Sequence, residues 1–418
     1  MDATAHFKGK KITVMGLGLL GRAVGDAKFL AEQGAELIVT DLKADHELRN
    51  SLQELAHLPN ITFHLEGHDM ADFKDRDLIL KAAGVPLDSI YIAEARKNNI
   101  PIKMSASWFA EIAQIPIVGV TGTRGKTTVT YMLNDIMRAA GMEVLLGGNI
   151  RGVSTLALLP QVTSQSIGLF ELDSWQCQGF GEEKISPNIA VFTTFMDDHL
   201  NYYKGDRDKY LDDKAQIFLN QKPEDTLVVS SQAAENLKKY KNNMHSHVVI
   251  AEPKNFPQNW KLRILGGHNV LNAMCAIEAA RALGIDDNII KSATENFKGV
   301  PGRLEFLREY NGVKIYNDTT ATMPDATLAA LEALGTQNTI LIMGGADKGL
   351  DMSRLEARLS ELKKVVRIEQ GLKEAVSEAV ALAKPGDTIL FSPAYASFGL
   401  FKNEYDRGDQ FNALVKAL

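Results

Sequence analysis

The chain has 418 residues and a formal net charge of −6, and 45% of its residues are hydrophobic. A chain of this length is too long to fold around a single hydrophobic core, so two or three domains are expected. The small negative charge argues against a protein that binds the backbone of nucleic acids. Cys177 and Cys275 lie far apart, so neither a disulfide framework nor a zinc site is predicted. No apolar run approaches membrane-spanning length and no signal peptide is evident, which favours the cytoplasm.

Residues 1–104 alternate strand and helix patterns, which predicts a parallel sheet in a Rossmann-like domain. The first strand pattern runs directly into a glycine-rich turn, and a helix pattern follows it. The expected elements are a strand and turn over 11–18, a helix from 21 to 34, and strands over 36–41, 77–86 and 100–104.

Gly16, Gly18 and Gly21 form a G-x-G-x-x-G turn, and Asp41 ends the next strand. This is the dinucleotide-binding fingerprint, in which a diphosphate binds at a helix N-terminus. NAD and other nucleotides with a diphosphate satisfy that pattern equally well. A nicotinamide-dependent dehydrogenase is therefore one open interpretation, and tight packing of strand and helix without a ligand is another.

A phosphate-binding loop is predicted within GVTGTRGKTT, residues 119–128, between a strand pattern and a helix pattern. Gly122 and Gly125 let the backbone turn so that its N–H groups converge on phosphate oxygens. Lys126 can reach the β- and γ-phosphates, and the Thr127 hydroxyl can bind Mg²⁺. The usual P-loop has a further glycine upstream, so the match is to a shorter form. The expected ATP-binding loop residues are Gly122, Thr123, Gly125, Lys126, Thr127 and Thr128.

The alternation continues through residues 105–300 and restarts after the boundary signal Gly299–Pro301 for residues 301–418. We expect the middle domain to be P-loop ATPase-like and the last domain to be Rossmann-like. The expected elements are a helix over 105–113, strands over 166–172 and 189–195, a helix over 207–220, a strand over 227–231, helices over 266–284 and 287–297, a strand over 313–318, a helix over 326–335, a strand over 339–345, helices over 354–364 and 372–383, and a strand over 387–393.

Further motifs follow the phosphate-binding loop in a fixed order. They are GGNI over 147–150, ELDSWQ over 171–176, DDHL over 197–200, a lone Lys214, GGHNVLN over 266–272, VPGRLE over 300–305, NDTTAT over 317–322, GGADKG over 344–349 and SPAYASF over 392–398. This series resembles the Mur ligases from end to end. In that family the N-terminal glycine turn holds the UDP of a sugar nucleotide rather than NAD.

The resemblance implies an ATP-dependent amide ligase. It is strongest to the members that add D-glutamate to UDP-N-acetylmuramoyl-L-alanine in peptidoglycan precursor synthesis. ATP would convert the carboxylate to an acyl phosphate, the amine of the amino acid would attack it, and phosphate would leave. ATP, two Mg²⁺ ions and a monomeric, cytoplasmic enzyme are expected.

The resemblance also assigns roles residue by residue. Lys126, His199 and Lys214 would be catalytic, with Lys214 carbamylated by CO₂ because an ammonium would repel a metal ion. The expected metal ligands are Thr127, Glu171, His199 and Lys214. Asn269, Asn272, Arg303 and Asp318 would bind ATP beside the loop. The expected substrate contacts are Gly18, Leu19, Leu20 and Asp41 for UDP, Asn149 and Gln176 for the muramoyl group, and Thr322, Lys348, Ser397 and Phe398 for the amino acid.

Departures from the family pattern gather around the predicted amino-acid site. Thr320 stands in place of a lysine and Glu404 in place of an aromatic residue, which removes a positive and adds a negative charge. Arg407 or Lys402 could compensate. Ligation of L-glutamate or another amino acid therefore stays open. The further departures from the family pattern are at Arg124, Asp173, Asn201, Gly302, Met323 and Gly399.

Overall fold

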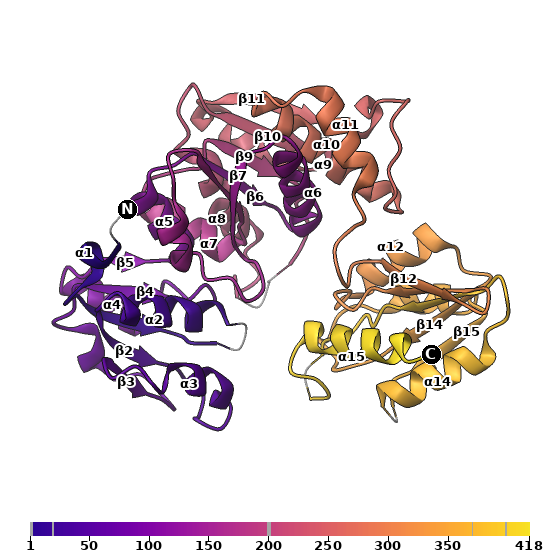
Figure 1. The fold of residues 1–418 in the computed structure, drawn as a ribbon, viewed down its shortest axis with the longest axis horizontal. Coiled ribbons are helices and arrows are strands. Elements are labelled where there is room, and N and C mark those ends of the chain that lie inside the picture. The colour runs from indigo at the N-terminus through magenta and orange to yellow at the C-terminus, as the bar shows by residue number, and fades with distance from the viewer. Residues whose placement is uncertain (1–2, 19–20, 199–201, 370, 398) are drawn as a thin grey trace. The chain divides into compact units, whose positions relative to one another are not determined.

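The computed structural model describes residues 3–18, 21–198, 202–369, 371–397 and 399–418. It contains three sheets that follow one another along the chain (Figure 1). Helices connect successive parallel strands in each sheet, as alternating strand and helix patterns predict. The predicted α/β class is confirmed.

The first sheet has five parallel strands in the order β3-β2-β1-β4-β5. The glycine turn follows β1 at the carboxyl end of the sheet, where α/β proteins place their ligands. Its strands are β1 (Lys11–Met15), β2 (Glu36–Thr40), β3 (Ile61–His64), β4 (Leu78–Lys81) and β5 (Ile102–Lys103), and its helices include α1 (Ala3–Phe7), α2 (Arg22–Glu32), α3 (Arg49–Leu55) and α4 (Ile90–Lys97).

The second sheet has six parallel strands in the order β11-β10-β9-β6-β8-β7. The phosphate-binding loop follows the central strand β6. The strands are β6 (Ile117–Thr121), β7 (Glu143–Gly148), β8 (Ser166–Glu171), β9 (Ile189–Phe192), β10 (Thr226–Ser230) and β11 (His247–Ala251), and the helices are α5 (Ser105–Ala113), α6 (Lys126–Ala139), α7 (Ser174–Glu182), α8 (Arg207–Leu219), α9 (Ser231–Leu237), α10 (Gly267–Ala282) and α11 (Asp287–Asn296).

The third sheet, in the order β12-β13-β16-β14-β15, includes an antiparallel edge pair, β12 with β13. The helix pattern over 354–364 is interrupted, because α13 ends at Leu359 and Lys364 begins a strand. The strands are β12 (Glu305–Tyr310), β13 (Val313–Asn317), β14 (Thr339–Met343), β15 (Lys364–Arg367) and β16 (Thr388–Phe391), and the helices are α12 (Pro324–Leu334), α13 (Ser353–Leu359), α14 (Leu372–Leu382) and α15 (Glu404–Lys416).

The chain divides into two compact units. The first comprises Met1–Phe256 and Asn272–Ala293 and holds the first two sheets, whereas the second comprises Pro257–Leu271 and Thr294–Leu418 and holds the third. The expected division into three domains at residues 104 and 300 stays a prediction.

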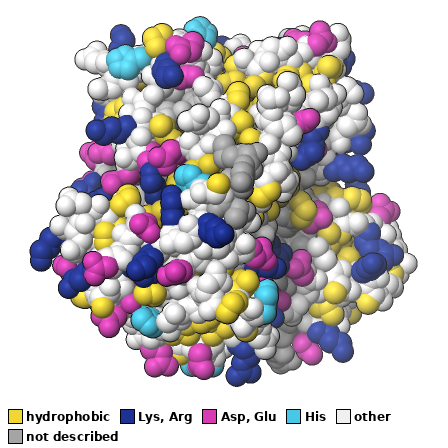
Figure 2. Space-filling view, turned by 60° about the vertical axis from the view of Figure 1, so that its left-hand side comes forward, with side chains coloured by type: hydrophobic (Ala, Val, Ile, Leu, Met, Phe, Trp, Pro, Cys, Tyr) yellow, Lys and Arg dark blue, Asp and Glu magenta, His cyan; other side chains and the backbone are white. Residues whose placement is uncertain are grey.

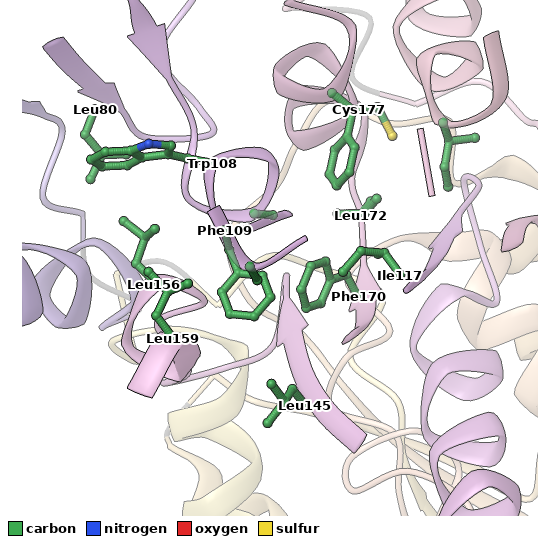
Figure 3. Packing of buried hydrophobic residues seen from close by; sticks show 14 of the residues in the cluster. Leu80, Trp108, Phe109, Ile117, Leu145, Leu156, Leu159, Phe170, Leu172 and Cys177 are labelled. Carbon is green, nitrogen blue, oxygen red and sulfur yellow. The ribbon is translucent and has the colours of Figure 1, made fainter. Parts of the chain in front are cut away.

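One buried cluster joins the first two sheets within the first unit (Figure 3). Leu80 of β4 and Trp108 of α5 both belong to it. Phe109 and Phe170 meet edge to face at its centre, with ring centroids 5.4 Å apart. Burial of this continuous apolar surface is the main force that holds the two sheets in one unit.

A buried polar contact reinforces that packing. Asp26 of α2 accepts hydrogen bonds from the hydroxyls of Ser105 at 2.8 Å and Ser154 at 2.6 Å. A Cβ atom on Gly25 would lie 2.7 Å from the Cβ of Ser154, so only glycine allows α2 to approach this closely. Burial raises the pKa of Asp26 to about 6, although the hydroxyls oppose the shift.

Cys177 and Cys275 are both buried and unpaired. Burial raises the pKa of each thiol to about 12. On the face that Figure 2 shows, acidic and basic side chains are interspersed, which agrees with the small net charge. No helix in the described part of the chain has the length and apolar character that a membrane crossing requires.

We predict that Asp26→Asn stabilises the first unit at neutral pH, because an amide oxygen still accepts from the two serines without a buried charge. Below the unfolded-state pKa of 3.8 both states hold the aspartate proton, so the gain is absent. As the pH rises from 3.8 to about 6, Asp26 loses its proton in the unfolded state before it does so in the folded state, which lowers the stability of the wild-type protein. The stability advantage of Asp26→Asn over wild type therefore grows across this range and is constant above it.

Melting temperatures measured from pH 4 to pH 8 check this, with exposed Asp45→Asn as the control. A difference between Asp26→Asn and wild type that does not change over this range would contradict it.

Candidate active site

The loop between β6 and α6 has the backbone geometry of a phosphate-binding loop. Gly122 and Gly125 have φ values of +140° and +86°, which disfavour other residues. A Cβ on Gly122 would lie 2.1 Å from the Thr193 hydroxyl, and one on Gly125 would lie 2.2 Å from Asn272 Oδ1. Gly125 is also the N-cap of α6, so the positive end of that helix faces the loop.

Two lysines converge on this loop. Lys126 Nζ donates to the carbonyls of Gly122 at 3.0 Å and Thr123 at 3.2 Å. Lys214 Nζ, on α8, donates to the same Gly122 carbonyl at 2.8 Å. Lys214 is 1% exposed, and burial, reinforced by Lys126, lowers its pKa to about 7. Lys214 therefore lies against the phosphate-binding loop and not at the solvent-exposed surface of the protein.

Glu171 ends β8 beside the strand that precedes the loop, since it pairs in register with Val120. It is 3% exposed, and its Oε1 accepts from Asn149 Nδ2 at 3.3 Å. Its Oε2 is buried and has no hydrogen-bond partner among the described residues. A buried carboxylate oxygen without a donor is costly unless a cation binds it, so this atom fits a ligand of Mg²⁺.

Four predicted site residues, His199, Leu19, Leu20 and Phe398, lie outside the described residues. Within the described ranges, no three His, Cys, Asp or Glu side chains gather closely enough to hold a metal. The predicted metal site needs a hydroxyl, His199 and a modified lysine besides Glu171, so it stays a prediction.

The Asp41 carboxylate shapes the N-terminal glycine turn. Its Oδ2 accepts from the amides of Leu17 at 2.8 Å and Gly18 at 3.2 Å, and its Oδ1 accepts from Lys43 N at 2.9 Å. Both oxygens are thus engaged with backbone, and the residue is 5% exposed. A contact of this carboxylate with the ribose of a dinucleotide or with the predicted UDP would have to compete with these bonds, so the role of Asp41 in binding stays a prediction.

A cavity of about 190 Å³ lies within the first unit and brings predicted substrate residues together. Gly18 from the glycine turn and Gln176 from α7 both line it. Arg22 lines it as well and donates through Nη1 to Asn149 Oδ1, so Asn149 joins the same group. Sequence reasoning did not identify Arg22, although its place as the first residue of α2 after the glycine turn was a signal.

The departure at Asp173 has a structural explanation. Asp173 is the N-cap of α7, where its side chain accepts from Gln176 N at 2.8 Å. Gln176 Oε1 in turn accepts from Asp173 N at 3.2 Å. This reciprocal capping box orients Gln176, and aspartate serves as well as serine at an N-cap.

The predicted amino-acid residues of the second unit lie on loops after neighbouring strands β13, β16 and β14. Backbone hydrogen bonds join these loops, from Ala394 N to Ala321 O and between Ala346 and Ala396 in both directions. Lys348 Nζ donates to Thr322 Oγ1 at 3.2 Å, and Ser397 is 2% exposed. The structure therefore places Lys348 and Thr322, which come from two loops, within hydrogen-bond distance, and their role in binding the amino acid stays a prediction.

The nearby ATP residues of the second unit are placed as follows. Asp318 accepts from Leu304 N at 2.9 Å and from Ser392 Oγ at 2.8 Å, so its carboxylate is anchored, while Arg303 is exposed. Gly302 has φ +71°, which explains the glycine at this departure from the family pattern. Asn269 is buried and donates to Leu265 O at 2.6 Å.

Arg407 does not supply a free cation to this region. It is fully buried on α15 and donates to Tyr395 O at 3.1 Å, Thr319 O at 2.8 Å and Thr319 Oγ1 at 3.3 Å. Burial lowers its pKa to about 10, with Glu404 opposing the shift. The guanidinium therefore ties two loops together, and its compensation for Glu404 stays a prediction.

Comparison with known proteins agrees with this geometry. The family model described as "Mur ligase middle domain" matches residues 120–256, and "Mur ligase MurD-like, N-terminal domain" matches residues 10–104. A UDP-N-acetylmuramoylalanine–D-glutamate ligase of Roseiflexus sp. is 34% identical, over 98% of this chain and 99% of the relative. The chain belongs to the Mur ligase family. Members of this family are ATP-dependent ligases that use Mg²⁺, so this chain is an ATP-dependent ligase.

Other Mur ligases extend the comparison. A second D-glutamate ligase, from Borreliella burgdorferi, is also 34% identical over 99% of both chains. Among solved structures, MurF of Thermotoga maritima in complex with ADP has a TM-score of 0.59 at 17% identity, covering 100% of this chain and 98% of that one. MurC of the same organism has a TM-score of 0.58 at 20% identity, covering 98% and 99%. These structures share the fold.

We predict that Gly125→Ala reduces ATP turnover by roughly 100-fold, because the new methyl group displaces Asn272 and distorts the loop. Gly141→Ala is the matched control, since Gly141 also has a positive φ, +77°, but a Cβ there meets nothing within 4 Å. The control should lose only about 1 kcal/mol of stability from backbone strain. Binding of an ATP analogue by calorimetry and steady-state turnover test the pair, and equal ATP affinity in both variants would contradict the assignment.

Proposed function

We propose that this ligase joins D-glutamate to UDP-N-acetylmuramoyl-L-alanine, with conversion of ATP to ADP and phosphate, in cytoplasmic peptidoglycan precursor synthesis. The relatives support this proposal, because two proteins that are 34% identical over almost their whole length are named UDP-N-acetylmuramoylalanine–D-glutamate ligase. The observation that carries the chemistry is that Lys126 and Lys214 both donate to the carbonyl of Gly122, in the loop after β6. The neighbouring strand β8 of the same sheet ends in Glu171, whose Oε2 has no partner among the described residues. A monomer suffices for the proposed reaction.

The proposed chemistry has two steps. A carboxylate oxygen of the muramoyl substrate attacks the γ-phosphorus of ATP, which forms an acyl phosphate and releases ADP. The amine of glutamate then attacks the acyl carbon, and phosphate leaves as the amide bond forms. Both steps bring anions together, so cations must lower the repulsion between them.

The lysines and glycines of the loop suit the first step. Lys126 exchanges its loop carbonyls for phosphate oxygens, and α6 presents its positive N-terminus at the same loop. Mg²⁺, when bound, supplies positive charge at the phosphates. In this proposal Thr127, Glu171, His199 and carbamylated Lys214 hold two such ions. The number of two ions rests on the family resemblance, and the Glu171 oxygen without a partner among the described residues supports a cation at that carboxylate.

Carbamylation of Lys214 is supported by its surroundings. The amine is buried beside a second cation, so its charged form is destabilised. Reaction of the neutral amine with CO₂ forms a carbamate and releases a proton, which converts a repelled cation into an oxygen ligand. An anion at this position also relieves the repulsion with Lys126.

The amino-acid pocket supports glutamate over a neutral amino acid. Lys348 and Thr322 are paired donors, and Ser397 lies on a loop tied to the loop of Lys348. Positive charge and hydroxyls recognise carboxylates. L-Glutamate is the alternative nucleophile, because Thr320, Met323 and Glu404 change the wall that distinguishes the isomers. The nicotinamide-dependent alternative is disfavoured by family membership.

The decisive test is phosphate release with UDP-N-acetylmuramoyl-L-alanine and ATP in the presence of D-Glu, L-Glu, D-Asp or L-Lys. We expect ADP and phosphate only with both substrates present and the highest kcat/KM for D-Glu. Lys348→Ala should raise the KM for glutamate by a far larger factor than the KM for ATP, because it removes a charge-assisted contact of about 2–3 kcal/mol.

Exposed Lys416→Ala on α15 is the control for Lys348→Ala. A preference for L-Glu would show that the ligase adds the L-isomer of glutamate, and a preference for L-Lys would rule out a pocket for two carboxylates. Formation of AMP and pyrophosphate would contradict the acyl-phosphate route.

We predict that Lys214→Ala loses nearly all turnover yet still binds an ATP analogue, because the loop geometry depends mainly on glycines. Lys209→Ala, with an exposed side chain on the same helix, should retain activity. Small carboxylic acids that occupy the vacated space should restore part of the Lys214→Ala activity. Full activity of Lys214→Ala in CO₂-free buffer would contradict carbamylation.

A further inference from the structure

Lys81 is a fully buried lysine that the proposed chemistry does not use. It ends β4, whose other residues Leu78, Ile79 and Leu80 are buried apolar side chains, and it is itself 1% exposed. A lysine at such a position is unfavourable unless its ammonium group is bound. A methionine would fill the same space without that cost.

The ammonium group is bound by three carbonyls of the chain that follows it. Lys81 Nζ donates to Ala82 O at 3.2 Å, Ala83 O at 3.3 Å and Val85 O at 2.6 Å. An ammonium group has three donors, and each has one acceptor here. The loop over residues 82–85 therefore wraps around a cation, as carbonyl oxygens wrap around a bound K⁺ ion.

This loop forms part of the wall of the cavity in the first unit. Lys81, Ala82, Ala83 and Gly84 line the cavity together with Gly18, Arg22 and Gln176. The loop also packs against the glycine turn, because a Cβ on Gly16 would lie 3.0 Å from Ala82 Cβ and 3.3 Å from Val85 Cγ2. A change in its conformation would thus alter both the cavity and the turn.

Burial and nearby carboxylates act on the Lys81 ammonium group in opposite directions. Burial lowers its pKa to about 8, whereas Asp173 and Glu182 of the α7 region and Asp213 of α8 oppose the shift. These carboxylates belong to the second sheet's helices, so the cation also lies in the field of the elements that face the loop.

We propose that Lys81 is a positioning residue for the sugar-nucleotide substrate. The ammonium group of Lys81 acts as a built-in monovalent cation that holds loop 82–85 in its binding conformation. The identity of that substrate rests on the proposed function. The role of the cation in ordering the loop rests only on the geometry of residues 81–85.

The test compares Lys81→Met, which keeps the side-chain volume, with Lys97→Met, whose side chain is 78% exposed on α4. In the absence of substrates, hydrogen–deuterium exchange should become faster in peptides covering residues 82–85 of Lys81→Met only. In turnover, its KM for UDP-N-acetylmuramoyl-L-alanine should rise about tenfold, with kcat and the KM values for ATP and glutamate close to wild type.

A second variant, Lys81→Ala, leaves room for an external cation among the three carbonyls. Added K⁺ or NH₄⁺ should lower its raised sugar-nucleotide KM and slow exchange in the loop, whereas Li⁺ should not. Equal effects of all three salts would overturn the proposal. So would unchanged exchange in the loop of Lys81→Met, or a uniform rise in exchange with equal losses in every kinetic constant.

The two hypotheses fail separately. If the wild-type protein does not ligate UDP-N-acetylmuramoyl-L-alanine with any amino acid, the proposed function fails while the exchange measurements still decide whether Lys81 orders the loop. If wild type is active and Lys81→Met has the same hydrogen–deuterium exchange in the loop and the same KM for the sugar nucleotide, the proposed role of Lys81 is wrong while the proposed function stands.

Discussion

The amines of Lys126 and Lys214 both donate to the carbonyl oxygen of Gly122, and the proposed chemistry of the first unit depends on that crowding. Lys126 and Lys214 repel each other there, so the arrangement favours an anion nearby. A phosphate group at Lys126 and a carbamate at Lys214 would each remove the repulsion. Glu171 Oε2 presents the converse case, a buried carboxylate oxygen that no donor among the described residues contacts and that is suited to a cation. The arrangement therefore suits anions beside the two lysines and a cation beside Glu171.

The first two sheets provide a rigid frame for this site. Their shared apolar core, the close approach at Gly25 and the serine contacts of Asp26 all join α2 to the second sheet. The cavity lined by Gly18 and Gln176 therefore has walls from both sheets within one packed unit. Residues that bind the same substrate can be held to fixed distances in such a frame, which favours orientation of reacting groups.

Local sequence predicted the turns well because their glycines are required by the backbone itself. The positive φ values at Gly122 and Gly125 are encoded by residue type, and the following helix is encoded by its apolar pattern. The edge strands β12 and β15 were missed because short, partly exposed strands lack a clear alternation. The engagement of Asp41 with two turn amides and the burial of Lys81 arise from contacts in the folded chain, so residue patterns did not reveal them.

Burial of both native cysteines has a practical consequence for spectroscopy. A thiol reacts as its thiolate, and neither Cys177 nor Cys275 combines exposure with a lowered pKa. A cysteine introduced at a solvent-exposed position of each unit would therefore be the preferred target of a maleimide dye or spin label, without prior removal of the native thiols. Distances between such labels could report the arrangement of the two units in solution as each substrate is added.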